Sequence, residues 1–104
     1  MPNYKDCKIF SIRSKTNPEH IYVGFTTLSL DKCWSYHKSL YNAKCPVQFY
    51  KVITDINDWY IQLEGYHPCN NKIEASIIKQ TYIDKLSTLN YKLNDEFSKN
   101  LYNY

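Results

Sequence analysis

The stretch from Lys8 to His37 decides the fold of this chain, and it reads KIFSIRSKTNPEHIYVGFTTLSLDKCWSYH. It holds two apolar runs with β-type periodicity, Lys8 to Ser14 and Ile21 to Thr26. The polar loop between them contains Asn17 and Pro18, a pair that favours a turn and interrupts ladder pairing. We therefore expect an antiparallel hairpin at this point.

A helix is predicted directly after the second of these runs, from about Ser29 to Asn42. Thr26, Thr27 and Ser29 offer capping hydroxyls, and apolar residues then recur at helical spacing. Cys33 and His37 are four residues apart, so they lie on one side of this helix. A second, short helix is predicted to begin at Pro46, because proline suits the first turn of a helix.

The second half of the chain contains one more strand and one long helix. Trp59 to Tyr66 alternates between apolar and polar residues, which predicts a strand with one wet face. Lys72 to Ser87 has helical recurrence and no helix breaker. The predicted fold class is α+β, a small three-stranded antiparallel sheet flanked by helices in the order β-β-α-α-β-α. The predicted core residues are Ile12, Val23, Phe25, Leu30, Trp34, Ile61, Leu63, Ile78 and Tyr82.

The composition favours one globular domain. The chain has 104 residues, of which 43% are hydrophobic and 22% are charged. We expect a single domain over 1–104, with its core at about 8–90 and a tail at 91–104 that forms a short helix around Asp95 to Tyr102. The sequence has no apolar run long enough to cross a membrane and no signal peptide, so an intracellular protein, cytoplasmic or nuclear, is expected. The four scattered cysteines are expected to be reduced thiols.

The formal net charge of +3 permits an anionic partner without requiring one. Among the thirteen basic residues only Arg13 is an arginine, so recognition of phosphate or guanine by a forked cation cannot be widespread. The abundance of Tyr, Lys, Asn and Ile indicates an AT-rich genome. Together with the small size of the chain, this bias is typical of a protein from a large DNA virus or a mobile element.

Three short motifs, taken in order, resemble the GIY-YIG nuclease superfamily. They are Lys8-Ile9-Phe10, Tyr22-Val23-Gly24 and the helix that carries Cys33 and His37. Later segments resemble the family too: 66–74 its link into the long helix, Lys79-Gln80-Thr81-Tyr82-Ile83 its glutamate motif, and Leu89-Asn90 its closing pair. The resemblance covers about 8–90 and implies a three-stranded antiparallel sheet with helices packed around it.

The resemblance implies six site positions, of which three have lost the family's residue. The family places two tyrosines, an arginine, a His or Tyr, a metal-binding glutamate and an asparagine where this chain has Phe10, Tyr22, Cys33, His37, Lys79 and Asn90. Phe10 lacks the hydroxyl, Cys33 lacks the permanent cation, and the ammonium of Lys79 repels the Mg²⁺ that a glutamate would bind. The resemblance thus implies a catalytically inactive domain with no metal ligand.

The remaining residues still allow a binding site. Tyr22, His37, Lys79 and Asn90 are the candidate ligand-binding residues, because the charge of Lys79 stands where the metal's charge would have been. A purely structural alternative is that Phe10 and Tyr22 pack against the sheet, that His37 is a histidine whose hydrogen bonds are made within the fold, and that Cys33 is an inert thiol. A further alternative is a zinc site formed by Cys33, His37, His67 and Cys69.

Three functions follow from these alternatives. The first is a non-catalytic GIY-YIG-like module that binds DNA or RNA through a remnant phosphate pocket, with no cofactor. The second is a divalent-metal-dependent endonuclease with a relocated metal ligand, which would use Mg²⁺. The third is a module for protein interaction or self-assembly, which eleven tyrosines and two tryptophans favour because such residues anchor interfaces.

Overall fold

The computed structural model describes residues 3–45 and 48–86. The predicted start of the second helix at Pro46, the predicted tail helix and Asn90 lie outside these residues. In chain order the elements are η1 (Tyr4–Asp6), β1 (Lys8–Ser14), β2 (Ile21–Thr26), α1 (Leu30–Asn42), α2 (Gln48–Val52), η2 (Ile56–Asp58), β3 (Trp59–Tyr66) and α3 (Lys72–Leu86).

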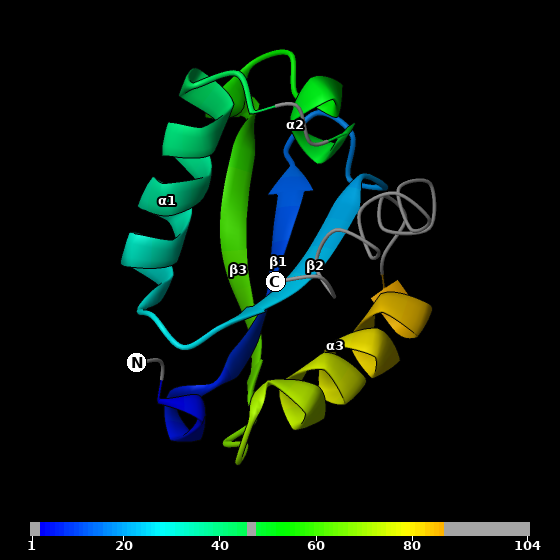
Figure 1. Cartoon of the computed structure of the whole chain (residues 1–104). Coiled ribbons are helices and arrows are strands. Elements are labelled where there is room, and N and C mark those ends of the chain that lie inside the picture. The colour runs from blue at the N-terminus through cyan, green and yellow to red at the C-terminus, as the bar shows by residue number, and fades with distance from the viewer. Residues whose placement is uncertain (1–2, 46–47, 87–104) are drawn as a thin grey trace.

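The three strands form one antiparallel sheet in the order β2-β1-β3, and α1 and α3 lie on opposite sides of it (Figure 1). The predicted α+β class, with a small antiparallel sheet flanked by helices, is confirmed. The hairpin register pairs Phe10 with Gly24 and Ile12 with Tyr22. Since residues directly opposite each other share a face, Phe10, Ile12 and Tyr22 point to the same side of the sheet.

Both faces of β1 are buried. On one face, Phe10 and Ile12 pack against residues from α1 and α2. On the other face, Ile9 is fully buried together with Val23 and with Ile83 of α3. A strand with two buried faces belongs in the centre of a sheet, which is where β1 lies.

The helix ends follow ordinary capping chemistry. Ser29, one of the three capping hydroxyls that the sequence offers, is the N-cap of α1, and its hydroxyl oxygen accepts a hydrogen bond from the Lys32 amide at 3.3 Å. At the start of α3, Asn71 accepts a hydrogen bond from the Glu74 amide at 3.0 Å. These contacts fix where each helix leaves the sheet, and therefore where its side chains meet the strands.

The buried core differs in part from the predicted one. Ile12 and Val23 are fully buried, whereas the other seven predicted core residues are half-buried. Ile9 and Phe49, which the sequence did not single out, are 0% and 1% exposed. The difference arises because α2 inserts Phe49 beneath the sheet and α3 covers the face that carries Ile9.

Truncating a buried isoleucine should cost far more stability than truncating an exposed one. We expect Ile12→Ala to lower the free energy of unfolding by about 2–5 kcal/mol, since it leaves a cavity at the centre of the sheet. Ile73→Ala is the matched control: Ile73 is 72% exposed on α3, and we expect a change within about 0.5 kcal/mol. Urea unfolding measures both, and equal losses would contradict the placement of β1.

Candidate functional site: a closed aromatic cluster beside an open polar hollow

Four of the six predicted site positions lie on one face of the sheet. Phe10 and Tyr22 come from the paired strands β1 and β2, and Cys33 lies in the first turns of α1. His37 follows one turn later, and its ring centroid is 5.6 Å from that of Phe10. Gly24 permits this arrangement, since a Cβ there would lie 2.6 Å from the tip of the Phe10 ring.

Two aromatic residues of α2 close this cluster. The ring of Phe49 stacks on that of Tyr22 with 4.1 Å between their centroids, and Tyr50 packs beside Phe49. Tyr22 is 5% exposed and Cys33 is 4% exposed. Tyr22 and Cys33 therefore belong to the hydrophobic core and do not line an open pocket. This agrees with the alternative in which both are packing residues.

The electrostatics of the cluster agree with this closure. A hydrogen bond of 2.8 Å joins Nδ1 of His37 and the hydroxyl of Tyr50. Burial lowers the pKa of His37 to about 4. Burial also raises the pKa values of the Tyr22 hydroxyl and the Cys33 thiol. All three groups are neutral near pH 7, so they supply neither a cation for phosphate nor a group that readily exchanges a proton.

The structure separates Lys79 from this cluster. Lys79 lies on α3, on the opposite face of the sheet, where its Nζ is 5.6 Å from the ring centroid of Phe25. Burial, and then the neighbouring charge of Lys72, lower the pKa of Lys79. The structure thus brings Tyr22 and His37 together but places Lys79 with Phe25, on the other side of the sheet.

The four residues of the zinc alternative are likewise in two places. Cys33 belongs to the cluster under α1, whereas Cys69 packs against Cys7 and Ala75 on the side of α3. His67 forms a 2.7 Å hydrogen bond with the Tyr82 hydroxyl. Within residues 3–45 and 48–86, no group of three or more His, Cys, Asp or Glu side chains is arranged to hold a metal ion.

A polar hollow opens at the end of the sheet where β1 and α1 begin. It has a volume of about 620 Å³. Its lining includes two lysines, two aspartates, two hydroxyl side chains and one tyrosine: Lys5, Lys8, Asp6, Asp31, Thr27, Ser29 and Tyr66. In Figure 1 this end of the sheet lies at the bottom, away from α2.

Lys8 places a positive charge at this hollow. The residue is only 9% exposed, and its Nζ donates a 2.7 Å hydrogen bond to the carbonyl oxygen of Leu28. Its charge acts on Cys33, where it opposes the effect of burial on the thiol pKa. A cation from β1 therefore lies near the position where the family resemblance places an arginine of α1. Sequence reasoning missed Lys8, although the strand alternation puts it on the same face as Phe10 and Ile12.

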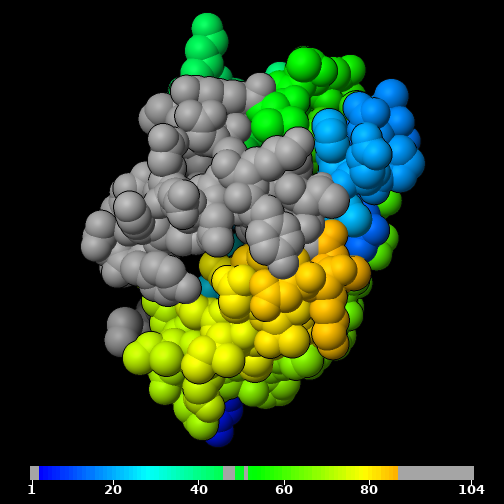
Figure 2. Space-filling view, turned by 90° about the vertical axis from the view of Figure 1, so that its right-hand side faces the viewer, coloured from blue at the N-terminus to red at the C-terminus, as the bar shows by residue number. Residues whose placement is uncertain are grey.

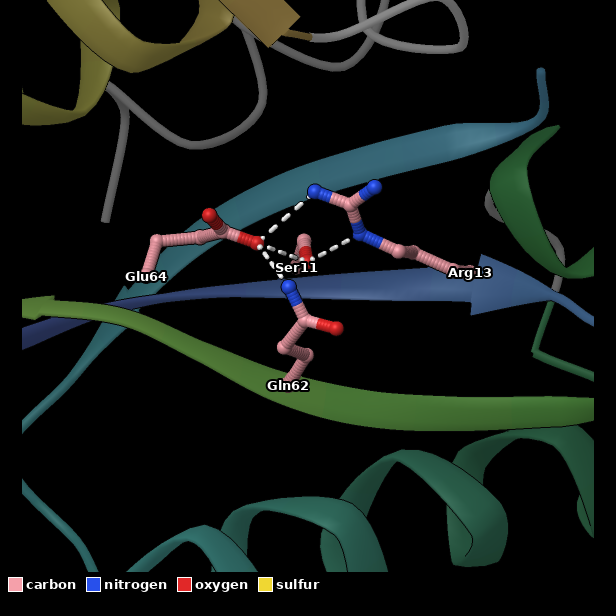
Figure 3. A network of polar contacts seen from close by, with 4 residues as sticks. All are labelled: Ser11, Arg13, Gln62 and Glu64. Atoms are coloured by element: carbon pink, nitrogen blue, oxygen red, sulfur yellow. Dashed lines mark hydrogen bonds and ion pairs between the residues drawn. The ribbon is translucent and has the colours of Figure 1, made fainter. Parts of the chain in front are cut away.

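The chain's single arginine is committed elsewhere. On the α3 side of the sheet, Arg13 donates to Oε2 of Glu64 at 2.9 Å and to the Ser11 hydroxyl at 2.9 Å (Figure 3). The same Glu64 oxygen accepts from Ser11 at 2.6 Å and from Gln62 at 3.1 Å. Because Ser11 is fully buried, this network satisfies polar groups within the fold, and it engages both Nε and one terminal nitrogen of Arg13.

Comparisons with known proteins neither support nor oppose the family resemblance. No protein-family model, curated protein or solved structure matches this chain. Within the described residues, no helix combines the length and the hydrophobicity needed to cross a membrane.

The burial of His37 should make stability depend on pH. Because its pKa is about 4 in the folded state against 6.5 ordinarily, the unfolded chain binds a proton first as the pH falls from 6.5 to 4. The free energy of unfolding should therefore decrease over this interval. Urea unfolding at several pH values should show a weaker decrease in His37→Gln than in the wild type. Equal pH slopes, or an NMR titration midpoint of His37 near 6.5, would contradict its burial.

Proposed function

We propose that this chain is a non-catalytic, GIY-YIG-like module that binds nucleic acid through a phosphate held at the Lys8 hollow. The carrying observation is the ammonium of Lys8 at this hollow, whose described hydrogen-bond partner is a carbonyl and not a carboxylate. An ammonium has three donors, and a phosphate oxygen is a strong acceptor for the ones that remain. The hydroxyls of Thr27 and Ser29 lie on the same hollow and are suited to donate to further phosphate oxygens.

The chemistry of the closed cluster supports binding without cleavage. Phosphodiester hydrolysis needs an activated water or hydroxyl and a cation to offset developing charge on the phosphoryl oxygens. Tyr22 and His37 are buried in neutral form, and Lys79 lies across the sheet from them. Among the described residues, the family positions thus offer neither a group that readily exchanges a proton near pH 7 nor a carboxylate to hold a metal.

The charges around the hollow set the strength of the proposed contact. Lys5 and Lys8 supply two positive charges, whereas Asp6 and Asp31 supply two negative ones. The hollow is therefore close to neutral overall, and affinity depends on the local geometry of Lys8 and on the net charge of +3. We infer weak binding that falls steeply with added salt, as phosphate contacts by lysine release counterions.

Removing the lysines of the hollow should weaken nucleic-acid binding. We expect Lys8→Met to raise the Kd for a short labelled oligonucleotide roughly tenfold or more, because a charge-assisted hydrogen bond is lost. The slope of log K against log salt should decrease by about 0.7–0.9 for the lost contact. Fluorescence anisotropy at several salt concentrations measures both quantities.

Two further variants keep this test decisive. Lys5→Gln probes the exposed lysine of the hollow if Lys8→Met does not fold, and it should also weaken binding. Lys85→Gln removes one positive charge from an exposed position on α3. It lowers the net charge as much as the other variants do, and the affinity should stay within about twofold of the wild-type value. Equal effects of all variants, or no binding by the wild type at low salt, would overturn the proposal.

A protein-interaction module is the second candidate, and the outer face of α3 favours it. Ile73 and Ile77 on this helix are 72% and 63% exposed. They line a shallow hollow of about 610 Å³ together with polar residues of the same helix. Figure 2 shows that α3, in yellow and orange, forms much of the lower part of one face of the molecule. Ile73→Asp with Ile77→Asp would abolish an interaction there while leaving binding at Lys8 intact.

The endonuclease alternative requires carboxylates at the hollow. Asp6 and Asp31 line it, and one or two carboxylates with bound water are what Mg²⁺ needs from a protein. Cleavage of the labelled oligonucleotide by wild-type protein with Mg²⁺, lost in Asp31→Asn and retained in Tyr22→Phe, would replace the binding module with an enzyme whose metal ligand has moved.

A further inference from the structure

Three residues, one from each strand, lie side by side at the end of the sheet that carries the hollow. The register places Lys8 of β1 directly opposite Thr26 of β2 on one side and Tyr66 of β3 on the other. Residues directly opposite each other in an antiparallel pair have Cβ atoms about 4.5–5.5 Å apart and share a face. The aromatic ring of Tyr66 and the ammonium of Lys8 therefore belong to the same surface, and both line the hollow.

Tyr66 is the most exposed tyrosine among residues 3–45 and 48–86. It is 69% exposed, compared with 58% for Tyr36 and 36% for Tyr60. An aromatic ring in this position leaves considerable apolar area in contact with water, which favours covering it with another flat group. Tyr66 is thus available as a stacking platform beside a cation.

We propose that the Lys8 hollow is specific for single-stranded nucleic acid, with one unpaired base stacked on Tyr66 while its phosphate contacts Lys8. This inference rests on the proposed function and names the class of ligand for the same site. Every nucleobase presents a flat face that can stack on a tyrosine, so the contact requires an accessible base and little sequence information.

The rest of the surface agrees with a preference for single strands. The bases of a duplex are already stacked and paired, so extruding one onto Tyr66 would cost a few kcal/mol. Reading a duplex instead requires donors that reach the base edges, most often a forked arginine. The one arginine, Arg13, is bound to Glu64 and Ser11 on the other face of the sheet. The structure therefore favours contact with the face of a free base over contact with base edges in a groove.

The test compares one labelled oligothymidine strand with the same strand annealed to its complement. Fluorescence anisotropy of the full chain should show tighter binding of the single strand than of the duplex at the same salt concentration. Tyr66→Ala should weaken single-strand binding roughly five- to a hundredfold, which is the range for losing one base stack, while Tyr66→Phe should retain it. Tyr36→Ala is the matched control from the exposed face of α1 and should have no effect.

The possible results distinguish the stacking inference from the proposed function on which it rests. If binding depends on Lys8 but is equal for single strand and duplex, or is unchanged in Tyr66→Ala, the stacking inference fails and the phosphate site stands. If wild-type protein binds neither strand at low salt, the proposed function fails. Urea unfolding of Tyr66→Ala checks that any loss is local, and a variant that fails to fold is replaced by Tyr66→Ser, for which the same loss is expected.

Discussion

The burial of β1 on both of its faces is the constraint on which the rest of this structure depends. Phe10 and Ile12 require cover from α1 and α2 on one side, and Ile9 requires cover from α3 on the other. A strand with two buried faces belongs in the centre of a sheet between two layers of helix. The hairpin with β2 and the pairing with β3 supply the two neighbouring strands, so residues 3–45 and 48–86 form a sheet with helices packed on both of its faces.

The same constraint explains where a ligand site is possible. Covering Phe10 and Tyr22 uses Phe49 and Tyr50 of α2, and this packing closes the face on which the family resemblance predicts a pocket. At the opposite end of β1, Lys8, Thr27, Ser29 and Tyr66 line an open hollow. The two ends of β1 thus differ. The end toward α2 carries the closed aromatic cluster, and the other end carries Lys8 at the open hollow.

Much of the fold was predictable from local patterns, whereas the spatial arrangement of the candidate site residues was not. The strands Ile21–Thr26 and Trp59–Tyr66 have the predicted bounds, and α1 begins directly after its predicted cap at Ser29. Apolar periodicity and capping are local signals, which is why they sufficed. The placement of Lys79 and the insertion of Phe49 depend on which face each helix covers, and a linear motif does not encode this. Strand alternation put Lys8 on the same face as Phe10 and Ile12, but its place in a candidate site became evident only from its contact with the Leu28 carbonyl.

The central claim is that ligand binds at the Lys8 end of the sheet and that the cluster of Phe10, Tyr22 and His37 stays closed. Titrating an oligothymidine strand into isotope-labelled protein, followed by amide and side-chain NMR, tests it most directly. The account predicts chemical-shift changes concentrated at Lys8, Thr27, Ser29 and Tyr66, with the signals of the closed cluster unchanged. Changes concentrated at Tyr22, His37 and Tyr50 would contradict it, because they would require α2 to leave the sheet and expose the site that its aromatic residues fill.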